Sequence, residues 1–78
     1  ARAAQPSPSA AVLTKATLRA ASLLGLNNAN LAQIVGVSES TVSRMAAGEK
    51  FLDIGTKPAE LATLLVRVYR SVDAFVGN

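Results

Sequence analysis

The stretch that decides the fold is residues 27–48, NNANLAQIVGVSESTVSRMAAG, near the middle of a 78-residue chain. Leu31 and Val35 give one apolar helical stripe, and Val42 and Met45 give a second stripe further along. Gly36 stands between the two stripes, where a helix that ends in a left-handed conformation favours glycine. The stretch therefore predicts two short helices joined by a tight turn, which is the helix-turn-helix arrangement.

Polar residues at the predicted helix starts suit capping. Asn27 and Ser38 each precede a helix, and their side-chain oxygens can accept from first-turn amides. Glu39 in the first turn of the second helix favours the positive end of its dipole. Asn30 stands where Glu or Gln would complete a capping box, so we expect a weaker start to the first of these helices. Gly48 is expected to end the second.

The rest of the chain is expected to build one domain around this motif. Residues 1–9 predict a disordered arm, because Pro6 and Pro8 disfavour a helix, and residues 10–78 predict a helix-turn-helix domain. The fold class is all-α: a compact bundle of four to five helices with a long C-terminal helix. The expected helices cover residues 10–24 with Ser9 as cap, 28–35, 39–47, and 57–76 with Thr56 as cap.

Apolar residues of the outer helices define the expected core. They are Leu13, Ala16, Thr17, Ala20, Leu23 and Leu24 in the first helix, Leu61, Leu64, Leu65, Val68, Val72 and Phe75 in the last, and Ile34 and Ala46 within the motif. Phe51, Leu52 and Ile54 are expected to close the core from a loop. A further apolar set is either a broad core face or a contact surface for a second copy or another domain: Leu18, Val66, Tyr69 and Val76.

Composition argues against catalysis and against a membrane protein. The chain has no cysteine and no histidine, which removes the commonest metal ligands and general bases, so we expect no enzyme activity, no metal and no cofactor. Its five acidic residues are scattered and form no pair on one exposed face. No apolar run is long enough to span a bilayer. The N-terminal composition also fits a transit peptide, but it continues into the next helix without a break, so a cytoplasmic, nucleoid-associated protein is expected.

A formal net charge of +3 and a pI of about 10.0 favour a polyanionic partner. A helix-turn-helix places its second helix in the major groove of double-stranded DNA. On that helix Ser40 and Arg44 are the best candidates for base edges, with a phosphate as the alternative for Arg44. Glu39 either accepts from a cytosine amino group or serves the helix start alone. The remaining candidates are Asn28, Ser43 and Lys50 for DNA, whereas Lys15 and Arg19 are interpreted as solvated surface charge.

Several short motifs together resemble a known family. They are Leu13-Thr14-Lys15, Leu24-Gly25-Leu26, the motif from Leu31 to Met45, Gly48, Leu52-Asp53, and the last helix from Leu64 to Phe75 with Tyr69-Arg70-Ser71. On these residues, the chain resembles the N-terminal domain of Xre-type antitoxins. Those are lambda-repressor-like proteins of the MbcA/ParS group, encoded beside RES-domain toxins.

The resemblance implies a lambda-repressor-like bundle that binds the operator of its own toxin–antitoxin operon. It adds Ser38 to the DNA-binding candidates, because the family's DNA contacts map to the start of the helix expected at residues 28–35 and to the helix expected at residues 39–47. In this family the toxin degrades NAD, and the antitoxin blocks it through a C-terminal domain that is expected to begin after Asn78. A cognate RES-type toxin is therefore an expected partner through a region absent here.

Two functions remain open at this point. One is sequence-specific DNA binding by an antitoxin-type repressor that acts as a homodimer or higher oligomer, because single helix-turn-helix units usually bind half-sites in pairs. The other is a protein–protein interaction module, which mediates oligomerisation or toxin docking without binding DNA.

Overall fold

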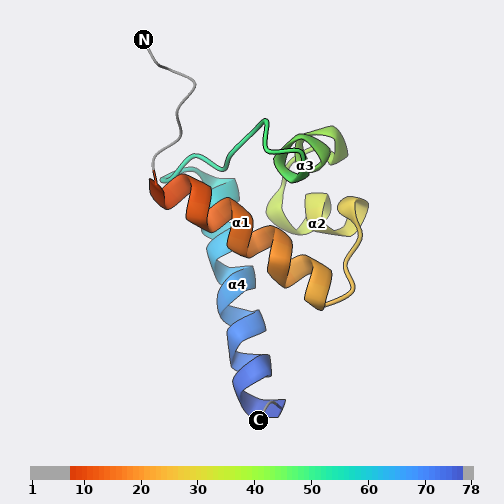
Figure 1. Cartoon of the computed structure of the whole chain (residues 1–78), viewed down its shortest axis with the longest axis vertical. Coiled ribbons are helices and arrows are strands. Elements are labelled where there is room, and N and C mark those ends of the chain that lie inside the picture. Colours follow the sequence, from red (N-terminus) through yellow and green to blue (C-terminus); the bar gives the residue numbers. More distant parts are fainter. Residues whose placement is uncertain (1–7, 77–78) are drawn as a thin grey trace.

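The computed structural model describes the backbone of residues 8–76 and the side chains of residues 9–75. Four helices make up this part of the chain: α1 (Pro8–Leu23), α2 (Asn28–Val35), α3 (Glu39–Ala46) and α4 (Lys57–Val76). α2 and α3 lie together on one side of α1, and α4 packs against α1 and then extends away from the other helices (Figure 1). The predicted all-helical bundle with a long last helix is confirmed.

The first helix begins slightly earlier than the sequence predicts. Proline is tolerated in a first turn, where its missing N–H has no intrahelical partner to lose, and α1 begins at Pro8. Ser9 consequently lies inside α1 and does not cap it. Of the predicted arm over residues 1–9, residues 1–7 lie outside the described part of the chain.

The predicted caps of α2 are present, and one of them is better than expected. Asn27 accepts from the backbone N–H of Asn30 at 2.8 Å, and the Asn30 side chain accepts from the backbone N–H of Asn27 at 3.5 Å. Asn30 therefore completes a capping box in place of Glu or Gln, although its return bond is long. At the other end Gly36 adopts a left-handed φ of 85° and donates to Ala32 at 2.8 Å.

Residues next to α3 in the chain cap both of its ends. Ser38 accepts from the backbone N–H of Thr41 at 3.1 Å, as predicted. At the C-terminal end, Gly48 has φ 80° and donates to the carbonyl of Met45 at 3.1 Å, and Glu49 donates to that of Arg44 at 2.8 Å. This pair of bonds is the Schellman motif, which stops the helix and satisfies its last carbonyls.

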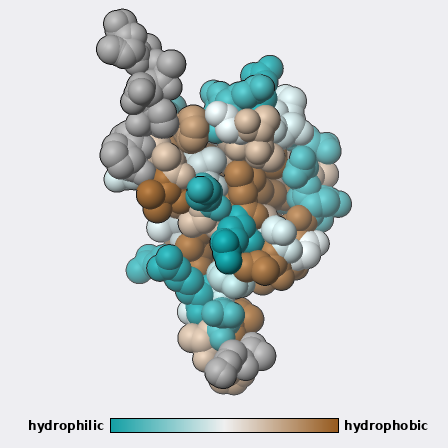
Figure 2. All heavy atoms as spheres, in the orientation of Figure 1, coloured by the Kyte–Doolittle hydropathy of each residue, from teal (hydrophilic) through white to brown (hydrophobic). Residues whose placement is uncertain are grey.

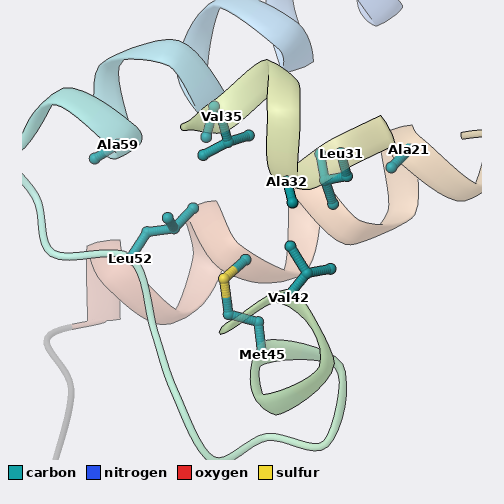
Figure 3. Packing of buried hydrophobic residues seen from close by; sticks show 9 residues of the cluster. Ala21, Leu31, Ala32, Val35, Val42, Met45, Leu52 and Ala59 are labelled. Carbon is teal, nitrogen blue, oxygen red and sulfur yellow. The ribbon is translucent and has the colours of Figure 1, made fainter. Parts of the chain in front are cut away.

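The core is built mostly from small side chains and is centred where α2 and α3 meet α1 (Figure 3). Leu31, Val35 and Val42 are its largest fully buried apolar side chains. Alanine allows helix backbones to approach closely, so a chain poor in aromatic residues can still form a buried core. The buried apolar residues are Ala10, Ala20, Ala21, Leu31, Ala32, Val35, Val42, Met45, Leu52, Ala59 and Ala62.

A buried hydrogen bond fixes the loop between α3 and α4 to α1. The Thr14 hydroxyl donates to Ala10 at 2.8 Å within α1, and it accepts from the backbone N–H of Leu52 at 2.9 Å. Leu52 closes the core as predicted and is 4% exposed, while Phe51 is half-buried. This bond could not be predicted from the sequence, because its partners are separated by 38 positions in the chain.

The predicted core face of α4 is largely wrong. Its buried residues are Ala59 and Ala62, and Leu61 and Leu65 are half-buried. The bundle is shorter than α4, so much of the apolar stripe has nothing to pack against among the described residues. Residues expected in the core but exposed are Leu64, Val68, Val72 and Phe75 of α4, Leu23 and Leu24 at the end of α1, and Ile34, Ala46 and Ile54.

We expect Thr14→Val to lower the free energy of unfolding by about 1–3 kcal/mol, because it leaves the buried N–H of Leu52 without an acceptor. Urea denaturation followed by circular dichroism measures this loss. Thr17→Val is the matched control: Thr17 is also buried in α1, but its hydroxyl donates only to Leu13 in the same helix, at 2.7 Å. Equal losses in the two variants would contradict the role given to Thr14.

Candidate nucleic-acid interface

The rotation of α3 about its own axis determines which side chains reach solvent. Val42 is 0% exposed and Met45 is 3% exposed, and Figure 3 shows both pointing into the core. The opposite face of the helix must then point outward. All four of its predicted contact residues are exposed: Glu39, Ser40, Ser43 and Arg44.

The start of α2 meets this outer face. The side-chain amide of Asn28, the first residue of α2, donates to the Ser43 hydroxyl at 3.4 Å, and both residues are exposed. A bond of this length is weak, but it joins side chains that lie 15 positions apart. Asn28 and Ser43 therefore form one continuous polar surface.

Ser38 has a structural role that limits what it can offer a ligand. Its hydroxyl oxygen accepts from the Thr41 N–H, and it lies 2.9 Å from the Thr41 hydroxyl and 3.1 Å from that of Ser40. One lone pair is thus used in the cap, while the proton can still be donated to a neighbouring hydroxyl or to an external acceptor. Ser38 belongs to the exposed polar surface but also holds the first turn of α3.

Cations near α3 are free of internal ion pairs. Arg44 and Lys50 are exposed, and within residues 8–76 the only salt bridge joins Lys57 to Glu60, at 3.8 Å. Lys15 of α1 lines a surface hollow together with Met45 and other residues at the C-terminal end of α3. Lys15 therefore lies close to the C-terminal end of α3. This proximity could not be predicted from the sequence, because only the packing of α1 brings the two segments together.

The residues predicted to form a partner surface are not the most exposed apolar residues of the structure. Leu18, Val66 and Tyr69 are half-buried, and Leu18 packs against the core cluster. The side chain of Val76 lies outside the described residues. A contact with a partner at these four positions stays a prediction, and the most exposed apolar residues of α4 are a different set.

Comparison with known families agrees with this geometry. The model of the antitoxin Xre-like helix-turn-helix domain matches residues 9–67, which include nearly all of α1, the whole of α2 and α3, and the first half of α4. A comparison with curated proteins gave no match. In residues 8–76, no helix is both long and apolar enough to cross a bilayer. With most of its length matched and a helix-turn-helix in place, the chain belongs to the antitoxin Xre-like helix-turn-helix family, a class of DNA-binding antitoxin domains.

Proposed function

We propose that the chain binds a specific operator in double-stranded DNA with α3 in the major groove, and that it thereby represses its own toxin–antitoxin operon. The observation that carries the proposal is the exposed polar face of α3, opposite the buried Val42 and Met45. α3 has eight residues and is about 12 Å long, close to the width of the major groove.

Base readout is assigned to the middle of this face. Arg44 carries a planar fork of donors that fits the two acceptors of a guanine edge, and Ser40 can donate to or accept from a base. Glu39 in the first turn can accept from a cytosine amino group. No acidic partner holds Arg44 within the described residues, so its side chain is free to extend into the groove.

Phosphate contacts are assigned to the edges of the face. Asn28 and Ser43 are held side by side, so one phosphate oxygen could accept from both. Lys50 follows the C-terminal end of α3 and supplies a flexible cation. Ser38 would act mainly by fixing the first turn of α3 and by donating its remaining proton.

A single copy offers few phosphate contacts, so affinity is expected to come from two copies on half-sites about one helical turn apart. The proposal therefore includes a homodimer or higher oligomer on a two-fold symmetric operator, at the nucleoid. Docking of a RES-type toxin through a C-terminal region remains a prediction of the family resemblance.

Arg44→Ala is expected to weaken binding to the selected operator by about 1–3 kcal/mol, roughly tenfold to a hundredfold, and to relax preference at one base pair. The operator is first obtained by selecting bound duplexes from a random pool, and affinities are then measured by fluorescence anisotropy at fixed salt.

Arg70→Ala is the matched control, because Arg70 is exposed on α4 and lies outside the proposed interface. Binding by Arg44→Ala equal to that of the parent would refute the placement of α3. If both arginine variants lost the same affinity, general charge would explain binding and a specific contact would not.

Lys50→Ala is expected to weaken binding to all sequences alike and to reduce the slope of log affinity against log salt by about 0.9, since it removes one phosphate contact. A salt titration with operator and with random duplex measures both effects. Lys57→Ala serves as control, because Lys57 is paired with Glu60 at the start of α4. An unchanged slope in Lys50→Ala would remove Lys50 from the interface.

Repression of its own operon is tested with a reporter gene behind the promoter that precedes the coding sequence. The parent and Arg70→Ala are expected to lower reporter output, whereas Arg44→Ala is expected to lose most of the repression at equal protein levels. Tight operator binding in solution without any repression would contradict autoregulation and leave DNA binding intact.

A protein–protein interaction module is the second candidate, and the exposed apolar side of α4 favours it. That side is formed by a different helix from the DNA-binding face, so the two activities are compatible. A chain that binds a partner protein but shows no salt-dependent affinity for any duplex would support this candidate alone.

A further inference from the structure

An open groove of about 490 Å³ lies between α1 and α4. The first half of α1 forms one wall and the middle of α4 forms the other. Figure 1 shows α1 crossing α4, and Figure 2 shows hydrophobic atoms on the first half of α1 and hydrophilic atoms on α4 below it. The residues that define this α1–α4 groove are Val12, Leu13 and Ala16 of α1 and Val66, Arg67 and Arg70 of α4.

The floor of the groove is apolar and only partly covered by the bundle. Val12 is 67% exposed, and Leu13, Ala16 and Val66 are half-buried. Leu13 also packs against the core cluster, so the fold of the domain holds the floor in place. Each Å² of apolar surface removed from water is worth about 25 cal/mol, so a partner with apolar side chains would gain free energy by covering this floor.

Two arginines place positive charge along the α4 side of the groove. Arg67 and Arg70 are exposed and three residues apart, so their side chains are neighbours on the helix surface. In the described part of the chain neither arginine makes a salt bridge, since the one ion pair there joins Lys57 to Glu60. Glu60 and Asp73 are the acidic residues of α4, and neither lines the groove.

The α1 side of the groove adds no negative charge. α1 has no acidic residue at any position, and its first turn therefore leaves the positive end of the helix dipole uncompensated. Ser9 of that first turn also lines the groove. The groove thus combines an apolar floor with a positive electrostatic surface, and an occupant of complementary chemistry is both apolar and acidic.

We propose that the α1–α4 groove binds an acidic amphipathic helix of another protein. Carboxylates three or four residues apart on that helix have about the same spacing as Arg67 and Arg70, and each guanidinium can bind a carboxylate through two hydrogen bonds. Apolar side chains on the adjacent face of the same helix would cover Val12 and Val66. A nucleic-acid backbone would pair with the arginines but leave the apolar floor exposed to water.

This inference does not depend on operator binding, because the groove is built from α1 and α4 whereas the DNA contacts are assigned to α2, α3 and Lys50. The test uses helical peptides of about 14 residues, or about four turns, with leucine at helical spacing and random residues at the other positions. Peptides bound by the 78-residue chain are selected from this pool. They are expected to be enriched in Asp and Glu beside the leucine face and to bind with micromolar dissociation constants in fluorescence anisotropy.

Arg67→Glu and Arg70→Glu are each expected to raise the dissociation constant of a selected peptide at least about tenfold. Arg44→Glu is the matched control: it makes the same charge change at an exposed arginine of α3 and is expected to bind the peptide like the parent. The double variant at positions 67 and 70 is expected to regain binding to a peptide in which lysine replaces the acidic residues. A purely structural role of the two arginines would not produce this exchange of charge preference.

Val12→Ser tests the apolar floor, because a side chain that is 67% exposed adds little to the fold of the domain. It is expected to weaken peptide binding severalfold and to keep the circular dichroism spectrum of the parent. Val68→Ser is its control, as Val68 is 56% exposed on α4 but does not line the groove.

Three results would overturn the proposal: selected peptides without enrichment of acidic residues, no peptide bound more tightly than about 1 mM, or undiminished binding in Arg67→Glu and Arg70→Glu. Loss of peptide binding in Arg44→Glu alone would place the peptide on the outer face of α3 and overturn it as well. None of these results would alter the affinity of the chain for its operator, which is measured separately.

Discussion

The burial of Leu31, Val35 and Val42 between α2 and α3 is the constraint on which the rest of the structure depends. All three side chains are at most 2% exposed, so neither helix can rotate without exposing them to water. This fixes the outward direction of Ser40, Ser43 and Arg44 before any DNA is present. The exposed polar face of α3 is therefore the direct counterpart of its apolar inner face.

The outer helices hold this unit in place with few large side chains. α1 and α4 contribute alanines such as Ala20, Ala21 and Ala62, which allow close helix contacts but bury little area each. The stability of a domain with so small a core depends more strongly on its buried hydrogen bonds. The Thr14 hydroxyl that receives the Leu52 N–H is the clearest case, because it ties the loop after α3 to α1 through the protein interior.

Local signals in the sequence predicted local structure well. The bounds of α2 and α4 and the caps at Asn27, Ser38 and Gly36 could be predicted from short stretches, because capping and glycine turns depend on near neighbours.

Which face of a long helix is buried cannot be predicted from such local signals. In α4 the large apolar residues formed the obvious stripe, but the bundle buries the alanines beside it, since the distance between packed helices is a property of the whole fold. The candidate DNA-binding residues were predicted from the motif, while the position of Lys15 beside α3 and the bond from Asn28 to Ser43 required the three-dimensional structure.

Both ends of α3 are closed by residues of the chain itself, with Ser38 at its start and Gly48 at its end. The helix is consequently organised in the free protein, and docking needs to order little more than the side chains of its outer face. Such a domain would meet its ligand as a nearly rigid body, with most of the conformational entropy already lost during folding. If α3 enters the major groove as proposed, discrimination between DNA sequences falls to the match of shape and hydrogen bonds at first contact, because the backbone of α3 has little freedom to adapt to a poorer site.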